Sequence, residues 1–350
     1  MTLHKPAPSP CVAPQDQHGR PMRSLRISVI DRCDLRCRYC MPEEEYSWLP
    51  RRDILTYDEI ETLVRRATEA GVRRVRLTGG EPLLRPGLGS LVRRLAAIPL
   101  VEDLAMTTNG TRLESAALEL RRAGLQRVTV SLDSLRRERF RQLTRRDSLE
   151  QVLAGIRRAS LAGFASLKIN TVVMRGQNDD ELADLLEYGA EVGAEVRFIE
   201  YMDVGGATLW TQSQVVPRAE ILERLQARYG PIAPDGPHAA APAERFRLPD
   251  GRRFGIVASV SEPFCRNCDR SRVTADGMWY LCLYAREGTD LRQLLRQGDA
   301  EALVEVMRMA WQQRRDRGAE ERRDSPHRGA LYQVEELRQD PHREMHTRGG

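Results

Sequence analysis

The stretch Leu25-Arg-Ile-Ser-Val-Ile30, followed by Cys33-Asp-Leu-Arg-Cys37-Arg-Tyr-Cys40, decides the fold. Its first part is short, apolar and β-branched, which is typical of a buried strand. Its second part places three thiols directly after that strand. In a barrel of βα repeats the site lies at the carboxyl ends of the strands, because the loops there converge. The stretch therefore predicts a metal-binding loop at the catalytic edge of a parallel sheet.

Similar strand–helix pairs recur along the chain. Candidate strands lie at 25–30, 72–77, 104–107, 127–132, 167–173 and 196–201. Thr56 and Glu59 form a capping box for one helix, and Gly71 suits its C-terminal cap. Asn178 with Glu181 opens another helix. Six repeats predict an α/β fold with a partial (β/α)6 TIM-like barrel, and a doubly wound sheet is the less specific alternative.

Three regions are expected. Residues 1–20 are rich in proline and polar residues and predict a disordered N-terminal arm, in which Cys11 is a bystander thiol. Residues 21–230 form the barrel. Residues 231–251, rich in Pro, Ala and Gly, predict a linker or long surface loop. Residues 231–350 as a whole predict a smaller C-terminal domain with its own cluster and a Gly-Gly tail.

Composition excludes several classes of protein. The 350 residues are 41% hydrophobic and 30% charged, as in an ordinary globular protein. There is neither a secretory signal nor an apolar run of the roughly 20 residues that a membrane span needs, so we expect a cytoplasmic protein without membrane contact. A net charge of +5 spread along the chain does not indicate a nucleic-acid partner. No histidine lies between residues 19 and 237, so the barrel cannot supply a histidine base.

Six of the seven cysteines form two groups, Cys33, Cys37 and Cys40, and Cys265, Cys268 and Cys282. A chain without an export signal keeps its thiols reduced, which favours metal binding over disulfides. The first group could instead be a buried helical stripe, but Asp34, Arg36 and Pro42 argue against that. Three thiolates suit a [4Fe–4S] cluster with one open iron. Zinc is the weaker alternative, because neither group has a histidine nearby to complete four ligands.

The first group, with Tyr39 before its last cysteine, resembles the radical S-adenosylmethionine (SAM) superfamily. Thr78-Gly-Gly-Glu-Pro82 after the second strand matches a further motif of that superfamily, where glycines let the backbone approach SAM closely. The resemblance implies that SAM binds the open iron and is cleaved to a 5′-deoxyadenosyl radical, which abstracts a hydrogen atom. It implies SAM contacts at Tyr39, Gly80, Ser131 and Met202.

The two cysteine groups, the run Arg270-Ser271-Arg272 and the terminal Gly349-Gly350 together resemble one family, the GTP 3′,8-cyclases of molybdenum cofactor biosynthesis. The resemblance runs from about residue 25 to residue 350. It implies GTP contacts at Arg26, Arg76, Thr107, Lys168, Arg270, Ser271 and Arg272, because arginine forks and a lysine suit a triphosphate. It also implies catalytic roles for Arg270, Arg272, Gly349 and Gly350. Arg348 departs from the apolar residue expected before the two glycines.

The reaction implied by the resemblance is a radical cyclisation of GTP between C3′ and C8, a lyase reaction. The resemblance implies SAM and two [4Fe–4S] clusters as cofactors. The second cluster is implied to bind the guanine edge. It also implies a low-potential electron donor and transfer of the product to cyclic pyranopterin monophosphate synthase. A monomer or a homodimer fits equally. Two rivals stay open: a radical SAM enzyme acting on a peptide or another nucleotide, and a zinc-ribbon protein that binds nucleic acid.

Overall fold

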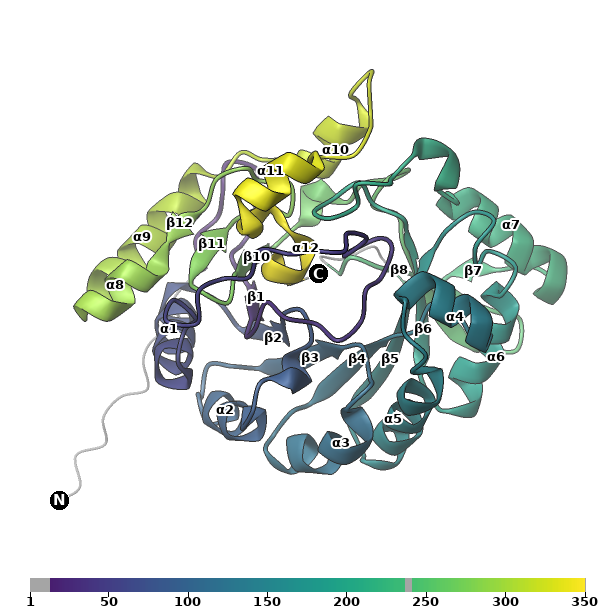
Figure 1. Ribbon diagram of the computed structural model, residues 1–350, viewed down its shortest axis with the longest axis horizontal. Helices are drawn as coiled ribbons and strands as arrows, with labels where there is room; N and C mark the ends of the chain where they lie inside the picture. The colour runs from purple at the N-terminus through teal and green to yellow at the C-terminus, as the bar shows by residue number, and fades with distance from the viewer. Residues whose placement is uncertain (1–12, 237–240, 350) are drawn as a thin grey trace.

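A computed structural model describes residues 13–236 and 241–349. Its strands form one sheet in the order β12-β11-β10-β1-β2-β3-β4-β5-β6-β9-β8-β7, which curves into a partial barrel (Figure 1). The sheet is parallel from β10 through β9, and an antiparallel hairpin extends it at each end. Within the described residues β12 does not pair with β7, so the barrel is open. The predicted α/β partial barrel is confirmed.

The barrel repeats alternate strands and helices. The strands are β1 (Ser24–Ser28), β2 (Arg74–Thr78), β3 (Asp103–Thr108), β4 (Arg127–Ser131), β5 (Ser166–Val173) and β6 (Glu195–Glu200). The helices are α1 (Tyr57–Ala70), α2 (Leu88–Ala96), α3 (Leu113–Arg122), α4 (Arg137–Thr144), α5 (Leu149–Leu161), α6 (Leu182–Glu191) and α7 (Arg218–Tyr229). Figure 1 shows these helices around the outside of the sheet. Each predicted strand is present, and its ends differ from the predicted ends by at most two residues.

Residues beyond 230 extend the same sheet at both ends. One end gains β9 (Arg253–Val257), β8 (Glu244–Arg247) and β7 (Ala233–Pro234), and the other gains β10 (Arg270–Val273), β11 (Met278–Tyr280) and β12 (Thr289–Asp290). The remaining helices are α8 (Leu291–Gln297), α9 (Ala300–Gln313), α10 (Gly318–Arg323), α11 (Val334–Gln339) and α12 (Met345–Arg348). The expected linker therefore contains strands, and the expected boundary at residue 230 is not a break in the sheet. In Figure 1 the last helix, α12, lies over the mouth of the barrel.

The apolar core lies between the sheet and its outer helices. Buried side chains of the strands, such as Ile27 and Leu77, belong to one cluster with the buried face of α1, such as Ile60 and Leu63. Side chains alternate along a strand, so the neighbours of these core residues point into the barrel. This alternation directs Arg26 and Arg76 inward, toward the candidate site.

The helix caps test two predictions. Thr56 and Glu59 form the predicted capping box, and Gly71 caps the C-terminus of α1 with a φ of 125°. The predicted cap at Asn178 is wrong, because α6 starts after Glu181 and lacks a side-chain cap. The Asn178 side chain instead accepts a hydrogen bond from the backbone of Met174 and donates to the carbonyl oxygen of Asp133. Asn178 therefore stabilises a loop rather than a helix.

The predicted disorder of residues 1–20 is wrong for residues 13–20. Asp16 accepts hydrogen bonds from the Nε of Arg20, at 2.5 Å, and from the backbone of His18 and Arg20. The side chains of Asp16 and Arg20 are 0% and 2% exposed. Arg20 also donates to the carbonyl oxygen of Cys265 at 3.0 Å, which ties this segment to the second cysteine group. Residues 1–12, with Cys11, lie outside the described residues.

No helix in the described part of the chain is long and apolar enough to cross a membrane.

Replacing Asp16 with alanine is expected to lower the free energy of unfolding by about 3–5 kcal/mol, because it leaves the Arg20 cation buried without its partner. Urea unfolding under anaerobic, reducing conditions measures the change. Glu102→Ala is the control: it removes a carboxylate that is 70% exposed, in an ion pair with Arg73, and should cost less than about 1 kcal/mol. Equal losses in the two variants would contradict the assignment of a buried pair.

Candidate functional site

A cavity of about 480 Å³ lies inside the barrel. Its volume falls within the range of small-molecule sites. Both cysteine groups line it, and all six of these cysteines are free thiols. The predicted SAM contacts Tyr39, Gly80, Ser131 and Met202 line the same cavity, as do the predicted GTP contacts Arg26, Arg76, Thr107, Lys168, Arg270 and Arg272. The structure thus brings together side chains that are spread over about 250 residues of sequence.

The first cysteine group is a loop and not a helical stripe. The backbone of Met41 donates to the carbonyl oxygen of Cys37 at 2.7 Å, which turns the chain before Cys40. Asn109 donates from Nδ2 to the sulfur of Cys33 at 3.7 Å. Burial, followed by the charge of Glu81, raises the pKa of the Cys33 thiol to about 12. This thiol therefore stays neutral until a metal takes the place of its proton.

The two glycines after β2 pack against the cysteine loop. The backbone of Gly80 donates to the carbonyl oxygen of Ile30, and that of Glu81 donates to Arg32, both at 2.8 Å. A Cβ atom at Gly80 would lie 2.2 Å from the Arg32 carbonyl oxygen, and one at Gly79 would lie 2.4 Å from that of Ile30. Glycine is therefore required here for contact between two loops, in addition to any contact with a ligand.

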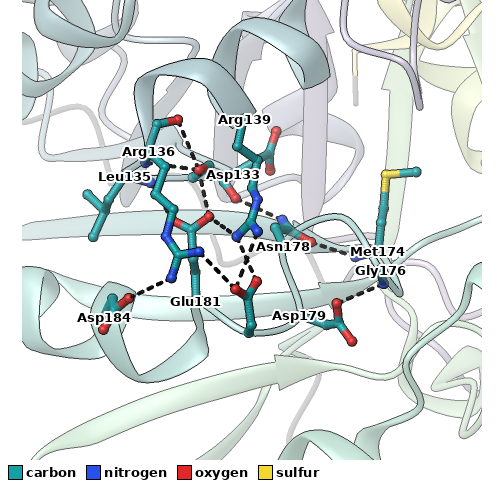
Figure 2. A network of polar contacts seen from close by, with 12 residues as sticks. Asp133, Leu135, Arg136, Arg139, Met174, Gly176, Asn178, Asp179, Glu181 and Asp184 are labelled. Carbon is teal, nitrogen blue, oxygen red and sulfur yellow. Dashed lines mark hydrogen bonds and ion pairs between the residues drawn. The ribbon is translucent and has the colours of Figure 1, made fainter.

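Tyr39 is held by a polar network in the wall of the cavity. Its hydroxyl donates to Asp133 Oδ2 at 2.7 Å, and the backbone of Val172 donates to Asp133 Oδ1 at 2.9 Å. Burial raises the pKa of Asp133 to about 6. Asn178 and the buried Glu181 fix the loop that carries Asp133, since Glu181 accepts from the backbone of Leu135 (Figure 2). The loop after β4, which follows Ser131, is therefore rigidly placed.

The second cysteine group is surrounded by cations. Arg270 donates to the sulfur of Cys268 at 3.5 Å, and Arg314 donates to it at 3.7 Å. Burial opposes ionisation of Cys268, but the two guanidinium groups lower its pKa to about 6. In contrast, burial raises the pKa of Cys282 to about 12. The group thus combines one stabilised thiolate with a neutral thiol.

Both cysteine groups fit an iron–sulfur cluster. Thiolates are the ligands such clusters use, and each group offers three of them in one cavity. In residues 13–236 and 241–349 no three Cys, His, Asp or Glu side chains are grouped so that they could hold a single metal ion. A four-iron cluster does not need that convergence, because each thiolate binds a different iron.

Three arginines form a row across neighbouring strands. Arg26 of β1 is in register with Arg272 of β10 on one side and Arg76 of β2 on the other. Burial, then the neighbouring guanidinium groups, lowers the pKa of Arg26 and of Arg76 to about 9. None of the three has a carboxylate oxygen within 4.0 Å in the described parts of the chain. Such a row is an electrostatic site for a strongly anionic ligand.

Lys168 adds a further cation opposite the row. Its side chain is 6% exposed, and its Nζ lies 4.0 Å from Glu195. Burial, then the charge of Arg197, lowers the pKa of Lys168 to about 7. Arg76 donates at 3.2 Å to the hydroxyls of both Thr107 and Thr129, which lie on the strands between β2 and β5. An anion bound here would meet charge and hydroxyl donors together.

Sequence reasoning missed several lining residues. They are Arg74, Arg127, Thr129, Arg197 and Arg245. Most of them lie on the same face of the sheet as a predicted residue, two positions away along the same strand or a neighbouring strand. The alternation of side chains from Arg76 and Lys168 could therefore have predicted them. His346 of the tail also lines the cavity, and burial lowers its pKa to about 3. The barrel strands lack histidine, but the tail brings one in.

Two predicted residues do not line the cavity, and a third lies outside the described residues. Ser271 is buried and does not line the cavity, because alternation along β10 turns its side chain away from those of Arg270 and Arg272. Gly349 does not line the cavity either, but its carbonyl oxygen accepts a hydrogen bond from Arg272 Nη1 at 3.4 Å. Gly350 lies outside the described residues.

Known proteins resemble this chain over most of its length. Residues 27–189 match the Radical SAM superfamily, and residues 194–320 match Molybdenum Cofactor Synthesis C. A protein of Mycobacterium tuberculosis named GTP 3′,8-cyclase 1 is 53% identical over 349 residues, which cover 98% of this chain and 97% of that protein. The chain belongs to the GTP 3′,8-cyclase family. A GTP 3′,8-cyclase of Xanthomonas axonopodis pv. citri is 47% identical over 90% of this chain and 96% of its own.

Solved structures share the fold. Streptococcus suis SuiB bound to S-adenosylmethionine has a TM-score of 0.56 at 16% identity, over 83% of this chain and 69% of its own. Native anSMEcpe with bound AdoMet has a TM-score of 0.52 at 17% identity, over 81% and 83%. As a member of the radical SAM superfamily, this chain is an enzyme that uses SAM and an iron–sulfur cluster.

Replacing Gly80 with alanine is expected to weaken SAM binding by at least about tenfold, because the new Cβ atom would push the glycine loop away from the cysteine loop. Calorimetry on anaerobic holoprotein measures the affinity. Gly329→Ala is the matched control, since a Cβ atom there meets nothing within 4 Å. Unchanged SAM affinity in the Gly80 variant would show that the close contact is not needed.

Proposed function

We propose that this chain cyclises GTP to (8S)-3′,8-cyclo-7,8-dihydroguanosine 5′-triphosphate, an early step of molybdenum cofactor biosynthesis. The observation that carries the proposal is one cavity lined by two cysteine groups and by Arg26, Arg76 and Arg272, which have no carboxylate partner within the described parts of the chain. Cations that are withdrawn from water without such a partner favour the binding of an anion, so an anion is expected there. A triphosphate has the charge to satisfy them.

The residues divide into three sets. Cys33, Cys37 and Cys40 would hold one [4Fe–4S] cluster, beside the SAM contacts Tyr39, Gly80, Ser131 and Met202. Cys265, Cys268 and Cys282 would hold a second cluster. Arg26, Arg76, Thr107, Lys168, Arg270 and Arg272 would bind GTP. The cluster held by Cys33, Cys37 and Cys40 would supply the electron for reductive cleavage of SAM, and the cleavage would supply the radical chemistry that removes the hydrogen atom at C3′ of GTP.

The chain's own contribution is to hold the substrate in one orientation. The arginine row and Lys168 fix the triphosphate, while Arg270 lies between that row and the sulfur of Cys268. A fixed substrate matters because a radical at a loosely held sugar would react elsewhere.

The wider context is part of the proposal. We infer a low-potential electron donor, a cytoplasmic location and transfer of the product to cyclic pyranopterin monophosphate synthase. A nucleic-acid-binding zinc ribbon is disfavoured, because the arginines that would contact phosphates line an internal cavity rather than an exposed surface. A radical SAM enzyme acting on a peptide offers no reason for the arginine row.

Cysteine substitutions test the assignment of the two clusters. Cys37→Ser should abolish SAM cleavage, whereas Cys268→Ser should retain SAM cleavage and lose the cyclised product. Wild-type protein should hold about eight irons and Cys268→Ser about four. An anaerobic assay with GTP, SAM and dithionite, read by mass spectrometry, measures both products. Cyclisation by Cys268→Ser, or wild-type protein that holds zinc, would overturn the proposal.

Lys168 predicts a pH dependence of GTP binding. With a pKa of about 7 in the ligand-free protein, Lys168 loses its charge as the pH rises through neutrality, while a bound triphosphate favours the charged form. GTP affinity should therefore fall by up to about tenfold between about pH 7.5 and about pH 8.5, where the phosphates are already ionised. Lys168→Arg stays charged and should remove this slope. Equal slopes for the two proteins would exclude Lys168 as the titrating group.

A further inference from the structure

Arg348 is a buried cation in the C-terminal tail. It is 1% exposed, although an apolar residue was expected at this position. Its Nε donates to the carbonyl oxygen of His342 at 2.5 Å, and its Nη1 donates to those of Leu283 at 2.9 Å and Ala285 at 2.7 Å. The guanidinium carbon lies 4.2 Å from the ring centroid of Tyr280. Arg348 therefore fills the position of an apolar residue with four directed contacts.

These partners are all uncharged. Throughout residues 13–236 and 241–349, no carboxylate oxygen lies within 4.0 Å of the Arg348 guanidinium. Three carbonyl dipoles and one aromatic face contact the guanidinium in place of water, while its Nη2 atom is buried without a hydrogen-bond partner among the described residues. Such contacts depend on the fork geometry of arginine, which a lysine cannot reproduce. Binding of Arg348 therefore requires the backbone carbonyls to lie in particular positions, which a simple attraction to a cation would not.

Two of the three bonded carbonyls, those of Leu283 and Ala285, belong to the second cysteine loop, which follows Cys282. Leu283 follows Cys282 directly, and the backbone of Ala285 donates back to the carbonyl oxygen of Cys282 at 3.3 Å. The guanidinium of Arg348 thus binds the turn that positions a predicted cluster ligand.

The next residue of the tail touches another part of the cavity wall. Gly349 packs so closely on β2 that a Cβ atom would lie 2.0 Å from Thr78 Oγ1, and its carbonyl oxygen accepts from Arg272. Thr78 begins the glycine motif assigned to SAM. Two consecutive tail residues therefore contact the second cysteine loop and the glycine motif.

We propose that Arg348 is a positioning residue that couples these two parts of the site. By binding the carbonyls of Leu283 and Ala285, it makes docking of Gly349 at β2 depend on the folded arrangement of the Cys282 turn. The tail then completes the site only when the second cysteine loop is in place. The catalytic consequence rests on the proposed cyclisation, but the docking itself does not.

Hydrogen exchange on anaerobic holoprotein, read by mass spectrometry, tests the docking without turnover. Arg348→Met keeps most of the side-chain length and removes every donor, so exchange of the backbone amides of residues 345–349 should rise by at least about tenfold. Exchange of the same amides should rise less in Arg348→Lys. The matched control is Arg343→Met, because Arg343 also lies over an aromatic ring, that of Tyr332, but pairs with Glu336 and Asp340 on the surface of the tail. Its exchange should stay within about twofold of wild type.

A double-mutant cycle tests the dependence on the Cys282 turn. Cys282→Ser should itself raise exchange in the tail, and adding Arg348→Met should raise it little further, because both changes break one connection. Additive effects would overturn the coupling. Unchanged exchange in Arg348→Met would also overturn the coupling, because Arg348 would then have no effect on the tail. Loss of iron together with faster exchange across residues 265–285 would overturn it too, because Arg348 would then only keep the loop folded.

An activity measurement separates this proposal from the proposed function. Arg348→Met should form more 5′-deoxyadenosine per cyclised product than wild type, while Arg343→Met should match wild type. An unchanged ratio in Arg348→Met would overturn the catalytic consequence. If wild-type protein forms no cyclised product, the proposed function fails while the exchange measurement still decides whether Arg348 seats the tail.

Discussion

Strand β1 pairs with β2 on one side and with β10 on the other, and the candidate site depends on this double pairing. The loop after β1 carries the first cysteine group, the loop after β2 carries the glycine motif, and the segment before β10 carries Cys265 and Cys268. Parallel register then sets Arg272, Arg26 and Arg76 in one row. Without the pairing of β10, the second cysteine group would not face the first.

The guanidinium groups of the arginine row repel one another in the ligand-free protein. Arg272 is buried, and Arg26 and Arg76 are partly buried; each lies beside others of the same sign, which costs free energy in the ligand-free protein. Other buried arginines have partners within the chain: Arg20 pairs with Asp16, Arg328 pairs with Asp203, and Arg348 bonds to backbone carbonyls. The contrast indicates that the row is kept for an anionic ligand, whose binding would relieve the repulsion.

Much of the fold was predictable because local signals were strong. The strands were short β-branched runs, and the Thr56 capping box is a local hydrogen-bond pattern that sequence spacing reveals. Long-range features were not predictable in the same way. Burial of Asp16 depends on Cys265 and Trp311 segments far along the chain, and Asn178 resembled a helix cap while its partners lay in other loops.

In the candidate site, too, some residues could be predicted from the sequence and others could not. The cysteines, Gly80 and the arginine row were found from motifs and from a family resemblance, and their common cavity brings them together. Ser271 was included with its neighbours although alternation turns it away, and Arg197 was missed although alternation points it inward. The seat of Arg348 depends on carbonyl groups of another loop, which composition and spacing do not encode.

The N-terminal segment has a consequence for biosynthesis of the protein. Residues near Arg20 bond to Trp311 and Cys265, and the bond between Arg20 and Trp311 spans 291 positions of sequence. At translation speeds of roughly 5–20 residues per second, the early partner waits about 15–60 s for the late one. The contacts between the N-terminal segment and the second cysteine group can therefore form only after the chain has been synthesised beyond Trp311. The part of the chain that is made first cannot take its final place until residues 291 positions later have been made.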